Sequence, residues 1–391
     1  MLTDLTHMPV NWIDGMKITK KHFEESEQYL HEQVRDVNAQ QLTDFSFGIL
    51  PAERSLDLTV FCDYSQQINV ELNACKAVTP NGIRVHITQT SAVKINTNFK
   101  EIAARFGLLT TQTQNLYITL NINPFNRVPT GEPLMNENPP RHPYTQPEIK
   151  LDIIPAEYIN TGQLTGSLVI GKISYQNGEL LFQREFIPSC TAVNSMPIVL
   201  DWHNRFRQLS ESWEQHCLKI IQKINAKSQQ ANSLTGSIQK LSEKVLEQLV
   251  SQKIYYQWII QKSAPVFMCE LLLRHIQHLY NTIICMAEKE REEMLNYFAE
   301  WADVQTGMID NQTVKALQIQ YNHYDINQVL SDIHQVYNLY LQIFQRLAQL
   351  EFIGKRKGQN IFVIEQEVKE AKAPPPTPKQ EKTTSRWSPL T

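Results

Sequence analysis

Two groups of polar side chains have a spacing that could serve chemistry. His275 and His278 are three residues apart in a helix-like stretch, so both imidazoles could share a face and hold a metal ion. No cysteine or aspartate falls in register beside them, and the edge of an amphipathic helix accounts for them better. Glu270 and Arg274, four apart, are typical of an ion pair along a helix, and the charged run 288–293 is typical of a solvated helix end.

The local signatures of catalysis are missing from the sequence. It has no glycine-rich loop for a dinucleotide or a phosphate, no G-x-S-x-G serine motif and no H-E-x-x-H zinc motif. His22 lies near Trp12 and could act as a base, but no nucleophile accompanies it. We therefore predict no catalytic residue, no metal ligand, no cofactor and no enzymatic activity. A hydrolase with a site assembled from distant segments is the enzyme alternative.

Composition narrows the class of protein further. The 391 residues carry 37 Lys and Arg against 40 Asp and Glu, which argues against nucleic-acid binding driven by bulk charge. The longest uncharged stretch, 106–126, is rich in Thr, Gln and Asn and predicts no membrane insertion. The N-terminus lacks the pattern of a secretory signal, and six widely spaced cysteines fit free thiols in a reducing compartment. These features predict a cytoplasmic protein.

Proline and glycine divide the chain near residue 197. Of 19 prolines, 13 precede residue 198, one lies between 198 and 372, and five fall in the last 19 residues. Glycine is equally scarce in the middle, with only Gly236 and Gly307 from residue 198 to 353. Because both residues break helices and punctuate strands, residues 1–197 are predicted to form a β domain and 198–353 a helical domain.

The first half has the alternation of half-buried strands. Apolar residues recur at every second position on both sides of the Pro80-Asn81-Gly82 turn, and again around Asn177-Gly178, which predicts two hairpins. Several such runs without interleaved helices favour an antiparallel β-sandwich or a barrel-like domain. Residues 124–147 hold seven prolines and no periodicity, so we expect a long loop there, either a binding loop or a hairpin extension without a partner.

The second half has helical periodicity. A stripe of seven apolar residues runs from Trp202 to Ile224, and Asp325 with Gln328 resembles a capping box at the start of a last helix. The heptad stripe of that helix could pack within the chain's own bundle, which we favour, or between chains in a trimer or tetramer. Its candidate oligomerisation residues are Ile326, Val329, Ile333, Val336, Tyr340, Ile343 and Leu347.

The C-terminal residues form two further predicted parts. Residues 354–372 are a short extension in which 360–364 could form a strand, and 373–391 are a proline-rich tail too poor in apolar residues to fold alone. Trp387 in this tail could anchor a docking peptide, although an unconstrained end is the simpler interpretation.

The N-terminal segment carries a resemblance to a known family. Residues 9–16, with Trp12, Gly15 and Met16, followed by His22 and Phe23, resemble the opening of TssK, the baseplate subunit of bacterial type VI secretion systems. Other short motifs fall in the family's order, and the likeness covers about residues 8–350. They include Phe47-Gly48, the turn 78–82, the strand 116–118, and the segments 171–173 and 186–190.

The resemblance implies a fold and a role. TssK-like chains have an N-terminal β-sandwich similar to the shoulder of phage receptor-binding proteins, a helical neck and a C-terminal head, and their trimers bind the wedge proteins TssF and TssG. It therefore implies an α+β homotrimer that links the baseplate wedge to the membrane-associated complex, docked at the inner-membrane face. The residues after Leu350 are too few for the head, so we expect either a divergent branch with a different membrane anchor or a separate chain in place of the head, and a membrane-side partner of unknown identity.

The candidate partner-binding residues follow from this segment. Trp12 and Met16 are four residues apart and Phe23 follows a turn later, so the segment could present large apolar groups to its own sheet or to a partner. Gly15 would permit a bend between them. The alternative function is a phage-tail-like receptor-binding or adhesion protein, for which the loop 124–147 would bind glycans.

Overall fold

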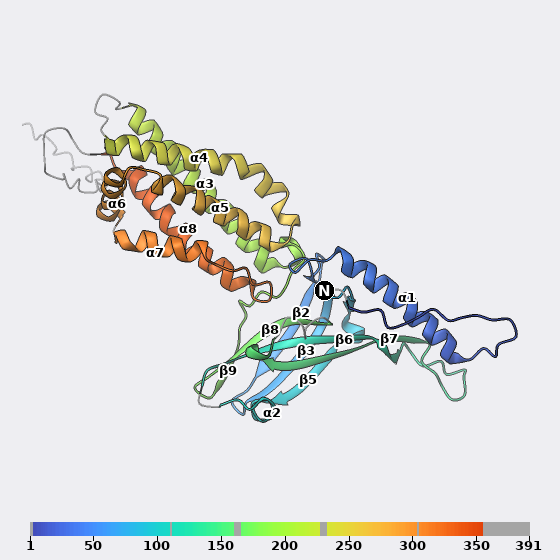
Figure 1. Ribbon diagram of the computed structural model, residues 1–391. Coiled ribbons are helices and arrows are strands. Elements are labelled where there is room, and N and C mark those ends of the chain that lie inside the picture. Colours follow the sequence, from blue (N-terminus) through green and yellow to red (C-terminus); the bar gives the residue numbers. More distant parts are fainter. Residues whose placement is uncertain (1–2, 110–111, 160–165, 227–232, 303–304, 355–391) are drawn as a thin grey trace, which may run out of the picture. The chain divides into compact units, whose positions relative to one another are not determined.

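The computed structural model describes residues 3–109, 112–159, 166–226, 233–302 and 305–354, and Met1–Gly354 form one compact unit (Figure 1). The N-terminal half of the chain forms two antiparallel β-sheets after a first helix, and the C-terminal half forms a helical bundle, so the predicted α+β fold is confirmed. The predicted extension 354–372 and tail 373–391, including Trp387, lie outside the described residues apart from Gly354.

The first sheet is built around one long strand. It contains β1 (Gly48–Ile49), β2 (Leu56–Cys62), β3 (Gln67–Val78), β4 (Arg84–Ile87) and β5 (Val93–Asn98), and β3 pairs with the other four. The predicted hairpin joins β3 to β4, with Gly82 at a φ of 85° in its turn and Val78 opposite Arg84. Alternate side chains of β3, such as Ile68, Val70 and Leu72, are buried, as the period of two predicts.

The second sheet has the order β7-β6-β8-β9. Its strands are β6 (Gln114–Thr130), β7 (Tyr144–Pro155), β8 (Ser167–Gln176) and β9 (Glu179–Phe182). The second predicted hairpin joins β8 to β9, where Asn177 and Gly178 both have positive φ. Side chains of the two sheets meet directly, since a Cβ at Gly171 of β8 would stand 3.0 Å from the Leu58 side chain of β2, so the sheets pack face to face as a sandwich.

The segment 124–147 differs from the expected loop. β6 continues to Thr130 and pairs with β7 up to Tyr144, with a register shift between Asn123 and Arg127, so only 131–143 form the tip. Beyond Asn121, β6 has lost its other neighbour, β8. Prolines are tolerated here because a two-stranded ribbon has free edges on which no N–H is needed.

The helical half begins where α3 starts, at Pro197. It comprises α3 (Pro197–Ala226), α4 (Ser233–Trp258), α5 (Pro265–Ile284), α6 (Glu288–Ala302), α7 (Thr306–Leu317) and α8 (Ile326–Gln349). The charged run 288–293 opens α6. In the described helices, none has a stretch that is both long and apolar enough to cross a membrane.

The heptad stripe of α8 is used inside the chain. All seven of its predicted residues are buried, among them Ile333 and Ile343, which are fully inaccessible, and α8 packs on α3, α5 and α6. Of the two alternatives for this stripe, packing within the chain's own bundle is therefore the one that the structure has. Its side chains have no surface left for a second chain in this conformation, so any role of theirs in oligomerisation would be to hold the bundle together.

The segment between α7 and α8 connects the bundle to the sandwich. His323 Nε2 donates a hydrogen bond to the Phe47 carbonyl oxygen at 2.9 Å, and its Nδ1 lies 2.9 Å from the Tyr321 hydroxyl. Asp325 pairs with Lys172 of β8 at 2.7 Å, and its side chain makes no cap for α8, so the predicted capping box is wrong. The Asp325 carboxylate binds Lys172 instead of the first amides of α8.

Candidate interaction site at the N-terminal segment

A tight turn folds the first aromatic residue back onto the following helix. Met16 N donates to the Ile13 carbonyl at 3.1 Å, and Gly15 has a φ of 82°, a left-handed conformation that glycine adopts without strain. The ring of Trp12 lies 6.0 Å from that of His22 and 6.4 Å from that of Phe23, measured between centroids. The five predicted residues of this segment thus come together in one place.

His22 also has a structural role at the start of α1 (Lys20–Gln41). The amide of Thr19, the residue before the helix, donates to His22 Nδ1 at 3.2 Å. This is the place that glutamate or glutamine takes in a capping box. Because Nδ1 accepts, the ring of a neutral His22 carries its proton on Nε2. The histidine thus holds the first turn of the helix and supports Trp12.

The amphipathicity of α1 is inverted. The buried residues of this helix are Glu32, Arg35 and Ala39. Its large apolar side chains point to solvent: Phe23, Leu30, Val34 and Val37 are each 58 to 63% exposed. A surface helix normally turns its apolar stripe to the core. Exposed apolar stripes of this kind are typical of interaction surfaces.

The polar face of α1 is held by a buried carboxylate. Glu32 is 1% exposed and accepts hydrogen bonds from the amide of Thr6 at 3.0 Å and from the amide of His7 at 2.6 Å. Arg35 lies 3.6 Å from the same carboxylate and donates to the hydroxyl of Thr3. Burial raises the pKa of Glu32, but these amides outweigh it and lower the pKa below its ordinary value. Glu32 therefore clamps residues 3–7 onto α1 as an anion.

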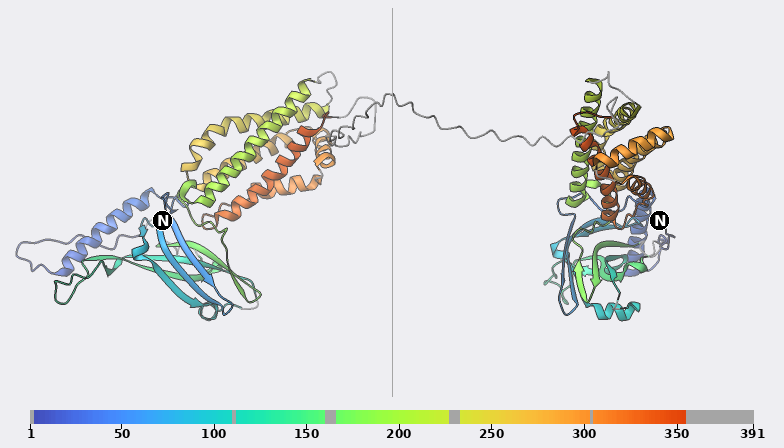
Figure 2. Two further views of the ribbon diagram at one scale, coloured as in Figure 1. Left: turned by 180° about the vertical axis from the view of Figure 1, so that it is seen from behind. Right: turned by 90° about the vertical axis from the view of Figure 1, so that its left-hand side faces the viewer.

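The ribbon of β6 and β7 closes the other side of this arm, and Figures 1 and 2 draw it beside α1. The ring of His7 stacks on that of Phe125 at 4.1 Å. Arg127 donates to His31 of α1 at 3.2 Å. The turn between β3 and β4 supports the helix from below, because a Cβ at Gly82 would stand 2.4 Å from the Arg35 carbonyl oxygen. The sandwich thus fixes α1 with its apolar face outward.

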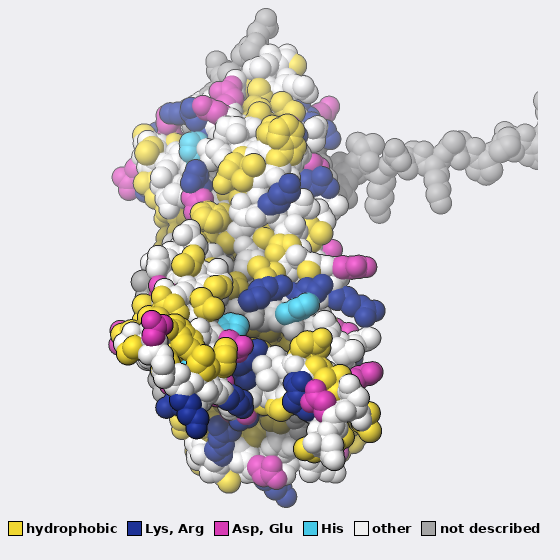
Figure 3. Space-filling model, turned by 90° about the vertical axis from the view of Figure 1, so that its right-hand side faces the viewer, with side chains coloured by type: hydrophobic (Ala, Val, Ile, Leu, Met, Phe, Trp, Pro, Cys, Tyr) yellow, Lys and Arg dark blue, Asp and Glu magenta, His cyan; other side chains and the backbone are white. Residues whose placement is uncertain are grey.

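We call the exposed apolar residues of this region the N-terminal apolar surface. It consists of Trp12, Ile13, Ile18, Phe23, Leu30, Val34 and Val37. Figure 3 shows hydrophobic side chains on the face from which α1 and the ribbon project, interspersed with Lys and Arg. Leu30, Val34 and Val37 were missed in the sequence, although their spacing of four and three residues was a signal that could have found them.

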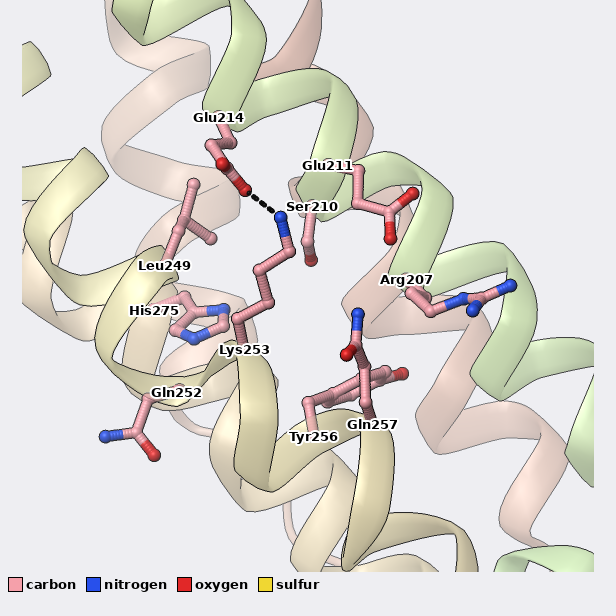
Figure 4. A pocket seen from close by; sticks show the side chains of 10 residues that line it. All are labelled: Arg207, Ser210, Glu211, Glu214, Leu249, Gln252, Lys253, Tyr256, Gln257 and His275. Carbon is pink, nitrogen blue, oxygen red and sulfur yellow. Dashed lines mark hydrogen bonds and ion pairs between the residues drawn. The ribbon is translucent and has the colours of Figure 1, made fainter.

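A small cavity in the bundle holds the remaining candidates for chemistry (Figure 4). It lies between α3, α4 and α5 and encloses about 20 Å³, room for one water. Lys253 pairs with Glu214 at 2.9 Å, and burial lowers the pKa of His275 to about 4. His275 Nδ1 lies 3.1 Å from the Tyr337 hydroxyl. The imidazole is thus a neutral member of a buried hydrogen-bond network.

Comparisons with known proteins extend the picture. No protein-family model and no curated protein sequence matches the chain. A crystal structure of TssK matches with a TM-score of 0.51 and 12% identity, over 87% of this chain and 70% of that one. TssK from the EAEC type VI secretion system, in complex with a nanobody, matches with a TM-score of 0.46 and 12% identity, over 83% of this chain and 69% of that one. A chain of the type VI secretion TssK-TssF-TssG baseplate subcomplex matches with a TM-score of 0.45 and 10% identity, over 88% of this chain and 100% of that one.

The first of these matches covers both the sheets and the bundle, since it takes in most of the chain. The fold that the N-terminal motif implied is therefore confirmed from an independent direction: this chain has the fold of TssK.

Proposed function

We propose that the chain is a non-enzymatic structural component of a bacterial type VI secretion baseplate. In this role it acts as a homotrimeric connector between the baseplate wedge and the membrane-associated complex, in the cytoplasm at the inner-membrane face. The proposal rests on the fold shared with TssK together with the sequence motif at residues 9–23. The small cavity in the bundle adds no feature that would favour catalysis.

The observation that carries the proposal is the inverted helix α1. A polar clamp at Glu32 and a close approach at Gly82 hold the helix so that Leu30, Val34 and Val37 face solvent. Exposing these side chains has a free-energy cost of roughly 25 cal/mol per Å² of apolar surface, which a partner removes by covering them. A fold built this way is suited to assembly through protein contacts.

We assign the N-terminal apolar surface to the wedge, that is, to proteins equivalent to TssF and TssG. The surface also exposes Glu24 and Glu27 on α1, and Glu27 lies in the apolar stripe between Phe23 and Leu30. A partner helix or loop that fits this surface would carry apolar residues and a basic group opposite Glu27. A different protein meets this requirement more readily than a second copy, in which two Glu27 side chains would oppose each other.

Co-purification with the TssF and TssG proteins of the same genome tests the proposal. We expect Val34→Glu to reduce binding at least tenfold, because a charge is placed in an apolar contact. Gln41→Glu is the matched control, since it adds the same charge to an exposed position of α1 and should bind like wild type. Equal binding by all three proteins would refute the assignment of this surface, and no binding by wild type would refute the baseplate role.

A further inference from the structure

The exposed residues of α1 have the spacing of a coiled-coil seam. Five of them follow one another at intervals of four, three, four and three residues, and we call them the α1 seam: Phe23, Glu27, Leu30, Val34 and Val37. In heptad notation Phe23, Leu30 and Val37 take the d positions, and the two residues between them take the a positions. The seam covers two heptads, roughly 21 Å of helix. Such spacing is typical of a helix that packs lengthwise against another helix.

The face by which α1 is held lies opposite the α1 seam. In the same heptad notation the buried residues Glu32 and Ala39 take f positions, and the buried Arg35 takes a b position. In a two-stranded coiled coil, a and d face the partner helix while b and f point away from it. Residues 3–7 and the sandwich thus bind α1 by the face that a coiled coil does not use.

The positions that border the α1 seam are polar and nearly uncharged. None of these e and g residues is buried, and they are Glu24, Ser26, His31, Gln33, Asn38 and Gln40. The chain's own β elements lie along the e side, since Arg127 of the ribbon donates to His31 at 3.2 Å and Asn38 donates to the Gly82 carbonyl oxygen at 3.4 Å. Charges at e and g usually set the choice of partner, and here Glu24 supplies one, which pairs with Lys20 at 3.0 Å.

The choice of partner therefore falls to Glu27, the charged residue within the α1 seam. A polar or charged group at a single core position fixes the register and the partner of a coiled coil. A carboxylate that a partner covers loses its water and needs a cation opposite it. Lys or Arg at the facing core position of another helix meets this need.

We propose that a wedge protein covers α1 with one amphipathic helix of about two heptads, which packs on the α1 seam as the second strand of a coiled coil and carries Lys or Arg opposite Glu27. Val34 at a and Leu30 at d are the residue types that favour two strands. Trp12, whose ring centroid lies 6.4 Å from that of Phe23, extends the contact at the N-terminal end. The inference rests on the proposed wedge contact and names the element that makes it.

Photo-crosslinking in the complex of the full chain with the TssF and TssG proteins of the same genome tests the inference. Benzoylphenylalanine takes the place of Leu30 in one protein and of Val37, one heptad further along, in another. We expect both to cross-link to one segment of a wedge protein, at residues about seven apart. The same group in place of Tyr64 is the control and should not reach that segment, because Tyr64 is exposed at the other end of β3 from the Gly82 turn.

The charge at Glu27 is tested by affinity. Glu27→Lys should weaken binding of the wedge proteins by roughly tenfold or more, because two cations would then meet in the contact. Replacing the basic residue of the cross-linked segment with glutamate should restore binding to this variant. Glu179→Lys makes the same change of charge at an exposed residue of β9 and should bind like wild type. Circular dichroism confirms that each variant is folded.

The outcomes separate the partner helix from the wedge contact. A wild-type chain that does not bind TssF and TssG overturns the baseplate role and this inference with it. Binding by wild type with cross-links from positions 30 and 37 that reach different segments overturns the helix and leaves the wedge contact standing. Equal affinity of wild type and Glu27→Lys overturns the basic residue. Cross-links to a second copy of this chain, in place of a wedge protein, also overturn the inference.

Discussion

Replacing Glu32 with alanine should release residues 3–7 from α1. The carboxylate accepts hydrogen bonds from both the Thr6 and the His7 amides. Alanine leaves these amides to find water, and it leaves the guanidinium of Arg35, which is buried, without its carboxylate. The arm can regain hydration only by leaving the helix. The substitution should therefore release residues 3–7 from α1 while the rest of the chain stays folded.

The magnitude follows from the contacts. A hydrogen bond to a charged group contributes about 1.5–3 kcal/mol, so two amide bonds set an upper range of about 3–6 kcal/mol. The arm can peel away and be hydrated, so we expect the loss at the lower end of this range, about 3 kcal/mol. That corresponds to an increase in arm exchange of roughly a hundredfold, since 1.4 kcal/mol is tenfold. Glu32→Gln keeps one acceptor oxygen and should lose about half as much.

Hydrogen exchange measured by mass spectrometry on an N-terminal peptide is the assay. Glu27→Ala is the control, because Glu27 is an exposed glutamate on the same helix and should leave exchange unchanged. Equal protection of the arm in wild type and Glu32→Ala would refute the clamp. The pKa of Glu32 is lowered from 4.5, so its contribution is complete above pH 4.5 and is lost as the pH falls through the lower folded-state value. The arm should thus stay docked at neutral pH and loosen only in acid.

Two further predictions concern the sandwich and its junction with the bundle. Gly48→Ala should reduce the free energy of unfolding by about 3 kcal/mol or more in urea titration, because Gly48 has a φ of 112° and its Cβ would stand 2.1 Å from the Ser189 carbonyl oxygen. Gly178→Ala, with open space around it, should reduce that free energy by about 1 kcal/mol, and equal losses would contradict this explanation. Burial lowers the pKa of His323 from 6.5 to about 4, so the unfolded chain binds a proton first as the pH falls, and this residue should account for a loss of stability of about 3 kcal/mol between pH 6.5 and 4. His323→Asn should reduce the slope by that share, while His275, whose pKa burial also lowers to about 4, keeps its own share. An unchanged slope would show that other groups cause it.

The strands could be predicted because their sequence signal is local. Alternation in β3 and β8 shows which face is buried. Glycine before Ile83 and the Asn-Gly pair before Glu179 supply the residues with positive φ in the two turns. The ribbon of β6 and β7 corresponds to the hairpin extension that was one of two alternatives for residues 124–147, but its strand pairing could not be predicted, because prolines are excluded from a central strand and not from a pair of strands with free edges. Sequence alone does not say how many neighbours a strand has.

The candidate site shows a different limit. The Trp12 to Phe23 segment was found through its motif, and the turn at Gly15 then followed from chemistry. Glu32 and Arg35 were not found, since a glutamate and an arginine three residues apart on a helix are usually solvated. They are buried here because residues 3–7 and the turn at Gly82 cover them, and these contacts join parts of the chain that are 25 to 47 residues apart.

The two amphipathic helices α1 and α8 show why periodicity does not by itself decide where a helix is bound. Both have apolar residues at spacings of three and four, yet Ile333 and Ile343 of α8 are inaccessible while Val34 and Val37 of α1 face solvent. The difference comes from the other face of each helix. In α1 that face carries Glu32, whose carboxylate is matched to two amides of the chain's own arm. A polar face with its own specific partners can thus outcompete an apolar stripe for the interior of the chain, and it leaves that stripe for another molecule.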